Sequence, residues 1–435
     1  MSKGLQSTAG RMNKIAVVGL GYVGLGLAVA LSKHYSVIGY DISKTRIAEL
    51  QQNIDKNNTV AYDELVKSTT IYTHQLEDIK EATFYIVAVS TPAYYYEMPN
   101  LEPLIYATQE LATVIKKGDI IVFESTVYPG TTEEICLPIL EKFSHLKHGD
   151  DFNVGYSPER INPDDKVHTL KNITKVISAQ NQATLEAIAV VYKSICDHVY
   201  PVSSIKIAEA VKVLENTQRD VNIAFMNEFA IIMHALNLNV HEILTAAQTK
   251  WSYVPFKPGL VGGHCIAVDP HYLAFKAKRV GVHPDLILAA RKINDDITHF
   301  VIQELLKLLI KNQVEVGKST IGILGVTYKE NTPDIRNSLS LKLIKELNAE
   351  GFYCQVQDPL ADKVILKDKY HINLIDFDQF KEVTAIILVV AHDFYRDAGL
   401  KKIMGTMKAP LIIMDIPNLF VSEAVSYEQL HYWSL

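Results

Sequence analysis

Short apolar runs rich in β-branched residues alternate with helix-like segments along the first 200 residues. Each run is typical of a strand buried on both faces of a parallel sheet. The runs occupy residues 14–19, 36–41, 84–89, 119–124, 152–156 and 175–178. Helical segments follow the first run as far as residue 33, and also occupy residues 101–117 and 131–140. This alternation predicts a parallel sheet covered by helices on both faces.

The pattern changes after residue 203. Residues 203–236 contain no glycine or proline, and their apolar positions recur at helical spacing. At 1.5 Å per residue this predicts one helix about 50 Å long. A second helix begins near residue 240, residues 251–270 form an irregular loop, and helices resume over 285–311.

The last third returns to the first pattern. Strand-like runs stand at 319–325, 353–358, 385–390 and 411–415, with a helix at 338–349. We therefore expect an α/β protein with two Rossmann-like domains, each with a parallel sheet, joined by a long central helix and a helical dimerisation region. The expected divisions are a flexible extension at 1–11, a dinucleotide-binding domain at 12–202, a helical region at 203–312 and an α/β domain at 313–435.

Composition narrows the class of protein. With 435 residues and 48% apolar types, the chain can build two or three cores. A formal charge of −6 offers no basic excess for nucleic acid or for anionic membranes. Four cysteines do not make a disulfide scaffold and suit a cytoplasmic protein. The uncharged run at 15–31 could be a signal peptide or a short membrane span, but its four glycines and missing cleavage site argue against both.

A glycine-rich turn follows the first predicted strand. Gly19, Gly21 and Gly24 match the pattern G-x-G-x-x-G, with Tyr22 and Val23 in the variable positions. The glycines permit a tight turn, close approach of a pyrophosphate and close packing of helix on strand. The helix N-terminus then offers N–H groups to the phosphates. A dinucleotide site is the favoured interpretation, and a ligand-free glycine turn is the alternative.

The second strand ends in Asp41. An acid there can accept hydrogen bonds from the adenosine ribose and repels a 2′-phosphate, which favours NAD over NADP. Arg46 lies nearby and weakens this discrimination, because arginine can bind a 2′-phosphate.

Cys265 stands in the most unusual stretch of the chain, PGLVGGHCIAVDP. Glycines on its N-terminal side let backbone approach a ligand closely, and Asp269 lies four residues beyond it. A thiolate in this loop could act as a covalent nucleophile. The alternative is a buried structural cysteine, as we expect for the other three. The spacing fits no zinc site.

The long helix places Lys212 and Asn216 one turn apart, on the same face as Glu209. A lysine beside an amide can stabilise an alkoxide or shuttle a proton, although such a face is often simply solvated.

Further polar side chains follow strand ends, where ligands bind in open α/β sheets. These are Glu124, Ser125, Thr126, Glu159, Arg160, Lys329 and Arg336.

Together these stretches resemble the UDP-glucose/GDP-mannose dehydrogenase family, from residue 14 to beyond residue 415. The motifs that carry the resemblance are GLGYVGL, STP, ESTVYPGTTE, SPERIN, the Lys212–Asn216 pair, GGHCIAVDP and YKENTPDIRNS. The segments ENTQRDVNIAFMNE and TKWSYVPFKPGLVGGHC look most like the branch that acts on UDP-N-acetylhexosamines. That branch supplies uronic acids for bacterial surface polysaccharides.

The resemblance implies a four-electron oxidation. One NAD takes a hydride from the sugar C6 alcohol, and Cys265 captures the aldehyde as a thiohemiacetal. A second NAD oxidises this to a thioester, which water hydrolyses. Residues implied as catalytic are Cys265, Lys212, Asp269, Asn216, Glu159 and Thr126.

The resemblance also implies binding residues and an assembly. Cofactor contacts are expected from Gly19, Gly21, Tyr22, Val23, Gly24, Asp41, Arg46, Ser90, Thr91, Thr126 and Arg336. Contacts to the UDP-sugar are expected from Glu159, Arg160, Lys212, Asn216, Tyr253, Lys257, Gly259, Gly262 and Lys329. The family forms its dimer around the long central helix, so a homodimer or larger homo-oligomer is expected.

Several alternatives stay open at this point. A two-electron β-hydroxyacid-type dehydrogenase needs neither Cys265 nor the second α/β domain. A non-catalytic nucleotide-sugar or NAD sensor would be expected to lack at least one of Cys265, Lys212 and Asp269, and all three are present. UDP-GlcNAc, UDP-GalNAc and UDP-ManNAc differ by single stereocentres, which one or two side chains distinguish. UDP-GlcNAc or UDP-GalNAc is favoured, with UDP-ManNAc and UDP-glucose as alternatives.

Overall fold

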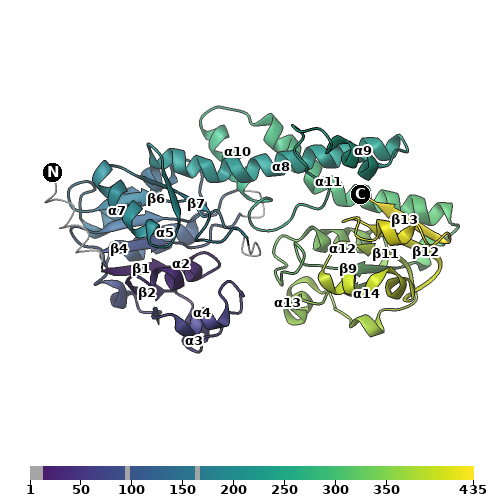
Figure 1. The fold of residues 1–435 in the computed structure, drawn as a ribbon, viewed down its shortest axis with the longest axis horizontal. Helices are drawn as coiled ribbons and strands as arrows, with labels where there is room; N and C mark the ends of the chain where they lie inside the picture. The colour runs from purple at the N-terminus through teal and green to yellow at the C-terminus, as the bar shows by residue number, and fades with distance from the viewer. Residues whose placement is uncertain (1–12, 94–97, 162–166) are drawn as a thin grey trace. The chain divides into compact units, whose positions relative to one another are not determined.

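The computed structural model describes residues 13–93, 98–161 and 167–435 (Figure 1). The chain divides into two compact units. Unit 1 extends to Glu215 and includes His271–Val282, and unit 2 contains Asn216–Pro270 and His283–Leu435. The division falls inside two helices, α8 (Ile205–Ala235) and α10 (Asp269–Arg279). The expected extension at residues 1–11 lies outside the described residues.

Unit 1 is built on an eight-stranded sheet with the order β3-β2-β1-β4-β5-β6-β7-β8. Its strands are β1 (Lys14–Val18), β2 (Ser36–Tyr40), β3 (Ile71–Thr73), β4 (Phe84–Val87), β5 (Ile120–Phe123), β6 (Asn153–Tyr156), β7 (Thr174–Ala179) and β8 (His198–Pro201). Every pair is parallel except β6 with β7, which departs from the predicted all-parallel sheet. Among the residues described between these two strands there is no helix, and an antiparallel neighbour needs no helical crossover.

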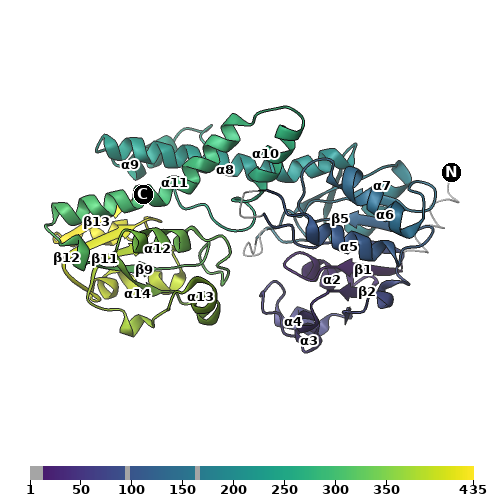
Figure 2. The same ribbon diagram turned by 180° about the vertical axis from the view of Figure 1, so that it is seen from behind.

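Helices cover this sheet (Figures 1 and 2). They are α2 (Gly24–Leu31), α3 (Lys44–Gln51), α4 (Tyr62–Lys67), α5 (Glu102–Ala112), α6 (Leu137–Ser144, preceded by a π-helical turn, Thr132–Cys136) and α7 (Gln182–Lys193). Apolar side chains of α2, α3 and α7 share one core with those of β1 and β4. The uncharged run at 15–31 is therefore a buried strand, the glycine turn and α2.

The long helix α8 has 31 residues, as the sequence predicts to within two residues at each end. In unit 2 it is followed by α9 (Val240–Ala247), and α11 (Asp285–Lys311) follows after the loop and α10. Apolar side chains of α8, α9 and α11 form one core with those of the second sheet.

The second sheet has five strands in the order β10-β9-β11-β12-β13, all of them parallel. They are β9 (Thr320–Leu324), β10 (Tyr353–Gln357), β11 (Val383–Leu388), β12 (Met407–Asp415) and β13 (Leu430–Ser434). The accompanying helices are α12 (Leu339–Ala349), α13 (Lys363–Tyr370), α14 (Asp393–Met404) and α15 (Val421–Ala424).

The three strands that the sequence pattern misses are edge strands, β3, β8 and β13. A central strand is buried on both faces and reads as a continuous apolar run, whereas an edge strand is short and partly solvated. β8, with the sequence HVYP, contains a proline and has mostly exposed side chains. Apolar patterning therefore carries little signal at these positions.

Candidate active site

The glycine-rich segment forms the turn between β1 and α2. Gly19 has φ +91°, a conformation that residues with side chains rarely adopt. A Cβ on Gly24 would lie 1.8 Å from the Gly19 carbonyl oxygen, so only glycine fits there. A Cβ on Gly21 would meet nothing within 4 Å. Tyr22 and Val23 complete the turn, and Val23 is the N-cap of α2.

Asp41 braces this turn from the end of β2. One carboxylate oxygen accepts the N–H of Leu20 at 2.8 Å and the other accepts the N–H of Ser43 at 2.9 Å. Each oxygen retains acceptor capacity for a further donor such as a ribose hydroxyl. Arg46 donates through Nε to the Leu20 carbonyl at 3.0 Å and pairs with Asp55 at 2.8 Å. Arg46 is thus engaged in holding the turn, and binding a 2′-phosphate would compete with these contacts.

The ends of β4 and β5 are tied together beside the glycine turn. The Thr91 hydroxyl donates to the Thr126 carbonyl at 2.6 Å. The Tyr272 hydroxyl, from α10, donates to the Thr91 carbonyl at 2.7 Å. Ser90 is exposed next to them. The predicted cofactor residues Ser90, Thr91 and Thr126 therefore occupy the carboxyl edge of the sheet, where open α/β folds bind ligands.

A buried charge cluster lies at the same edge, and sequence reasoning found only part of it. Lys175, fully buried in β7, contacts Glu124 at 2.6 Å and Glu159 at 3.4 Å. The Tyr192 hydroxyl donates to the second oxygen of Glu124. Burial raises the pKa of Glu124. Burial acts in the same direction on Glu159, but Lys175 leads the effects that hold its pKa below the ordinary value, so Glu159 is ionised at neutral pH. A lysine inside the apolar run TKVISA is the signal that could have revealed this cluster.

Lys212 and Arg160 lie in the same unit as Glu159. Lys212 is 8% exposed, and its charge is among those that lower the pKa of Glu159. Arg160 pairs with Glu215 of α8 at 2.7 Å and donates to the Thr174 carbonyl at 2.7 Å. The backbone N–H of Arg160 donates to Glu159 at 2.6 Å. The residues after β6 are thereby fixed to α8 and β7.

Glu209 shares the face of Lys212 but has a structural role. It is fully buried and accepts the backbone N–H groups of Gly130 and Thr132, the latter at 2.8 Å. These groups lie at the start of the helical segment that leads into α6. Burial raises the pKa of Glu209 to about 7, against the effect of the two N–H donors.

The cysteine loop belongs to unit 2. Cys265 is half-buried, and its carbonyl accepts the N–H of Asp269, the first residue of α10, at 2.8 Å. The Asn216 amide donates to the Asp269 carboxylate at 2.5 Å. The structure therefore joins three of the predicted catalytic residues through one carbonyl, one carboxylate and one amide.

Burial suppresses ionisation of the other three cysteines. Burial raises the pKa of Cys136, Cys196 and Cys354 to about 12 each. Such thiols stay protonated and inert at neutral pH.

The glycines before Cys265 pack on the loop that precedes α12. The Gly263 N–H donates to the Asn337 carbonyl at 3.3 Å, and the Asn337 amide donates back to the Gly263 carbonyl at 3.2 Å. A Cβ on Gly262 would lie 2.7 Å from the same Asn337 oxygen. The motifs GGHC and YKENTPDIRNS, distant in sequence, are thus in direct contact within unit 2.

The earlier part of the loop contains three predicted substrate residues. The Tyr253 hydroxyl contacts the Met226 sulfur at 3.7 Å. Lys257 is exposed. Gly259 forms two hydrogen bonds with the Asn227 side chain, at 2.8 and 3.0 Å. The sequence alone assigned no role to Asn227, which lies on α8.

Lys329 and Arg336 lie on the segment after β9. The Lys329 ammonium lies 5.6 Å from the centre of the Tyr328 ring. Arg336 is half-exposed and forms a fork with Asp334, with contacts at 2.6 to 3.0 Å. The Asp334 carbonyl accepts the Tyr328 N–H at 3.0 Å, which closes the segment into a compact loop.

The turn after β9 is held by an aspartate in the same way as the turn after β1. Gly325 has φ +89°, and the next N–H, of Val326, donates to Asp358 at 2.6 Å. Asp358 follows β10 as Asp41 follows β2. Asp358 also accepts the N–H groups of Thr327 and Ala361, at 3.2 and 2.8 Å. Its carboxylate thus accepts hydrogen bonds from several N–H groups of this turn.

Comparisons with known proteins agree with these features. Three models of the UDP-glucose/GDP-mannose dehydrogenase family match the chain: the NAD binding domain over residues 13–196, the central domain over 206–296 and the UDP binding domain over 322–422. The chain belongs to the UDP-glucose/GDP-mannose dehydrogenase family. It is therefore an oxidoreductase of the UDP-sugar dehydrogenase class, with NAD as its cofactor.

Individual relatives align along nearly their whole length. Protein CapL of Staphylococcus aureus is 47% identical over 98% of this chain and 100% of its own. A UDP-N-acetyl-D-glucosamine 6-dehydrogenase of Salmonella typhi is 44% identical over 94% of this chain and 97% of its own. The solved structure of a UDP-D-ManNAc dehydrogenase from Pyrococcus horikoshii has a TM-score of 0.86 at 29% identity, covering 97% of this chain and 98% of its own.

The first unit of this dehydrogenase fits NAD. The open side of Gly21 leaves room for a pyrophosphate at the N-terminus of α2, and Gly24 lets that helix lie close to the turn. Asp41 presents a carboxylate where the ribose hydroxyls of a dinucleotide lie in such folds. The turn after β9 in the second unit lacks a counterpart of the open Gly21: Gly325 is followed by Val326 and Thr327, and Asp358 accepts the N–H groups of both.

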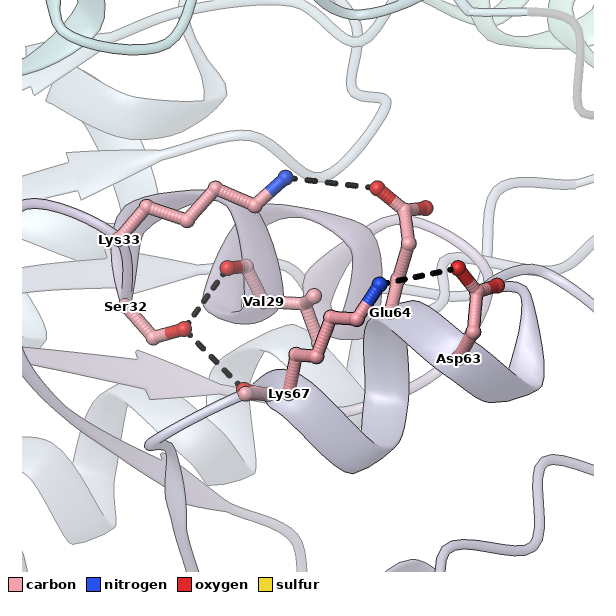
Figure 3. A pocket seen from close by; sticks show the side chains of 7 residues that line it. Val29, Ser32, Lys33, Asp63, Glu64 and Lys67 are labelled. Atoms are coloured by element: carbon pink, nitrogen blue, oxygen red, sulfur yellow. Dashed lines mark hydrogen bonds and ion pairs between the residues drawn. The ribbon is translucent and has the colours of Figure 1, made fainter.

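One pocket of the dehydrogenase lies away from this edge, at the C-terminal end of α2 (Figure 3). Its charged side chains are already paired: Lys33 contacts Glu64 at 3.3 Å and Lys67 contacts Asp63 at 3.5 Å. We assign it no part in the reaction. In the described ranges of the chain, no helix combines the length and the apolar character needed to cross a membrane.

Proposed function

We propose that the chain is an NAD-dependent UDP-N-acetylhexosamine 6-dehydrogenase that converts UDP-GlcNAc, or UDP-GalNAc, to the uronic acid. The observation that carries this proposal is the 44% identity with the Salmonella typhi UDP-N-acetyl-D-glucosamine 6-dehydrogenase over almost both whole chains. The product would serve surface polysaccharide synthesis, such as O-antigen or capsule. We further propose that the enzyme acts in the cytoplasm, where the Cys265 thiol stays reduced.

In the proposed mechanism Cys265 adds to the aldehyde formed at C6 and holds it as a thiohemiacetal, which becomes a thioester. NAD, when bound, accepts the hydride in each of the two oxidation steps. Covalent capture keeps the aldehyde in place between these steps. Water then cleaves the thioester, which releases the carboxylate and restores the thiol.

Lys212 and Asn216 would stabilise the oxyanions at C6. Asp269, held by the Asn216 amide, would exchange protons with water. Glu159 is suited to assist the water that hydrolyses the thioester, because Lys175 helps to keep it ionised. Thr126, at the end of β5, would help to hold this water.

The sugar nucleotide would bind to the loop of residues 251–270 and to the second α/β domain. Tyr253, Lys257, Gly259 and Gly262 would hold the sugar and the diphosphate, with Lys329 reaching the substrate from the loop after β9. Arg160 would contact the substrate beside Glu159, and Arg336 would face the cofactor. These assignments follow the family motifs.

We also propose that the enzyme is a homodimer built on α8. Exposed apolar side chains recur along α8 and the residue after it at intervals of 7, 11, 7 and 4 residues, which places them on a single face. They are Ile207, Leu214, Phe225, Ile232 and, one residue beyond the helix, Leu236. An apolar stripe along 31 residues is costly to leave in water and fits a second copy of the same helix.

The first experiment measures how many molecules of NADH form per molecule of UDP-sugar consumed. The reaction is run to completion separately with UDP-GlcNAc, UDP-GalNAc, UDP-ManNAc and UDP-glucose. We expect a ratio of two with UDP-GlcNAc or UDP-GalNAc. A ratio of one would favour the two-electron dehydrogenase. Turnover confined to UDP-ManNAc would favour the second candidate, which the likeness to the Pyrococcus horikoshii enzyme supports.

A further inference from the structure

A chain of buried polar side chains joins α8 to α11, and the proposed reaction does not use it. Asn227 and Asp220, on α8, and Asn294, on α11, are fully buried, and Arg291 is 4% exposed. Arg291 donates to Asp220 at 2.5 Å, and the Asn294 amide donates to the Asp220 carboxylate at 2.7 Å and to its backbone carbonyl at 3.0 Å. These direct hydrogen bonds fix the Asp220, Arg291 and Asn294 side chains relative to one another.

This series of polar side chains ends at the loop that contains Cys265. Because both Asn294 amide hydrogens point to Asp220, its oxygen faces Asn227 and accepts the Asn227 amide at 2.9 Å. The same Asn227 amide donates to the Gly259 carbonyl at 3.0 Å, and the Asn227 oxygen accepts the Gly259 N–H at 2.8 Å. The orientation of Asn227 is therefore set from α11, and its side chain pairs with Gly259 as a neighbouring strand would.

This pairing lies just before the reactive thiol. Residues 254–262 form no helix, strand or turn, so the loop depends on side chains for its shape. Asn227 holds Gly259, and Asn337 holds Gly263, two residues before Cys265. The two asparagines bracket a short glycine-containing span whose end fixes where the thiol can lie.

We propose that Asn227 is a positioning residue for Cys265, which acts through Gly259 and is itself oriented by Asn294 and Asp220. The proposal rests on the proposed function in one respect, that Cys265 is the nucleophile. A displacement of about 1 Å at a reacting atom can lower a rate about 100-fold. Loss of the two hydrogen bonds between Asn227 and Gly259 should therefore lower turnover while leaving the NAD site in unit 1 unchanged.

Asn227→Asp is the sharpest test, since it keeps size and the acceptor for the Gly259 N–H. It removes both donors and sets oxygen against the Gly259 carbonyl and Asn294. Asn222→Asp is the matched control on the same helix, because the Asn222 amide donates to the Gln218 carbonyl of its own helix, at 2.6 Å, and not to the cysteine loop. Asn227→Ser, which adds no charge, serves if the aspartate variant fails to fold.

Three readouts are compared in the 435-residue protein: hydrogen exchange of peptides covering 251–268, kcat with whichever of UDP-GlcNAc and UDP-GalNAc the wild type oxidises faster, and the Kd for NAD. We expect exchange in the loop to be at least tenfold faster in Asn227→Asp and kcat to be about 10- to 100-fold lower. The Kd for NAD should stay within twofold of wild type, and the control should match wild type throughout.

Loop exchange or kcat equal to the control would overturn the proposal. Faster exchange throughout unit 2 would also overturn it, since Asn227 would then act only in folding. If the wild type oxidises no UDP-sugar, the proposed function fails, while hydrogen exchange still decides whether Asn227 holds the loop.

Discussion

At the scale of single residues, the ionisation of a few buried groups determines what the site can do. Glu159 is almost fully buried, and burial alone would favour its protonated form. Lys175, also buried, offsets this and shares its charge between Glu159 and Glu124. The carboxylate proposed to assist hydrolysis thus depends on a lysine that never reaches solvent.

Replacing Lys175 by methionine should raise the pKa of Glu159 and move the acidic limb of the kcat–pH profile to higher pH. It should also destabilise the fold by about 3–5 kcal/mol, because two carboxylates lose their buried partner. Urea unfolding and the pH profile measure the two effects. The exposed Lys171→Met is the control, and an unmoved acidic limb in a folded Lys175→Met would separate Glu159 from hydrolysis.

Replacing Cys265 by serine should abolish uronate formation, since a hydroxyl forms no thioester intermediate of comparable reactivity. NAD binding should persist, because the glycine turn lies in the other unit. Product analysis and NAD titration test both statements. Cys354→Ser should retain turnover, as this thiol lies in β10 with a pKa of about 12. Full uronate production by Cys265→Ser would remove the covalent mechanism.

At the scale of elements, α8 presents a polar face that is buried along its length. Its members recur at intervals of 3, 4, 4 and 7 residues: Glu209, Lys212, Asn216, Asp220 and Asn227, each at most 8% exposed. Three of them bind other segments: Gly130–Thr132, the first residue of α10 (Asp269), and Gly259. The helix therefore positions, from one face, segments that lie far apart in the sequence.

Glu209 gives this face a pH-dependent stability. Its pKa of about 7 in the folded protein exceeds the unfolded value of about 4.3, so the folded state alone holds the proton between these limits. Wild type should thus lose stability relative to Glu209→Gln as the pH rises from 5 to 7, by up to about 1.4 kcal/mol per pH unit. Urea unfolding of both proteins at several pH values measures this, and a constant difference would contradict it.

At the scale of the whole molecule, the opposite face of α8 is the apolar stripe from Ile207 to Leu236. Leu214, Phe225 and Leu236 are each 58–62% exposed. A helix that buries its polar side and exposes its apolar side reverses the usual amphipathic arrangement. A second copy of the chain would bury this stripe.

Phe225→Asp should convert the proposed dimer to monomers, because a charge would enter the centre of an apolar interface. Light scattering coupled to size-exclusion chromatography measures the mass. Glu228→Gln, at an exposed position on the same helix, is the control. A monomeric wild type, or a Phe225→Asp protein of unchanged mass, would remove α8 as the interface.

Local patterns in the sequence were enough to predict the two α/β regions, the long helix, the glycine turn and the loop of Cys265. Each of these features rests on local chemistry: the apolar period, the glycine spacing or the residue type. Which side chains contact each face of these elements depends on residues that are distant in sequence, so local patterns could not predict it. Helical periodicity groups Asn216, Asp220 and Asn227 on one side, but their roles come from Asp269, Arg291 and Gly259, which are distant in sequence. Likewise, the lysine of β7 acquires its role only when parallel and antiparallel neighbours bring Glu124 and Glu159 beside it, since sheet order is a long-range property.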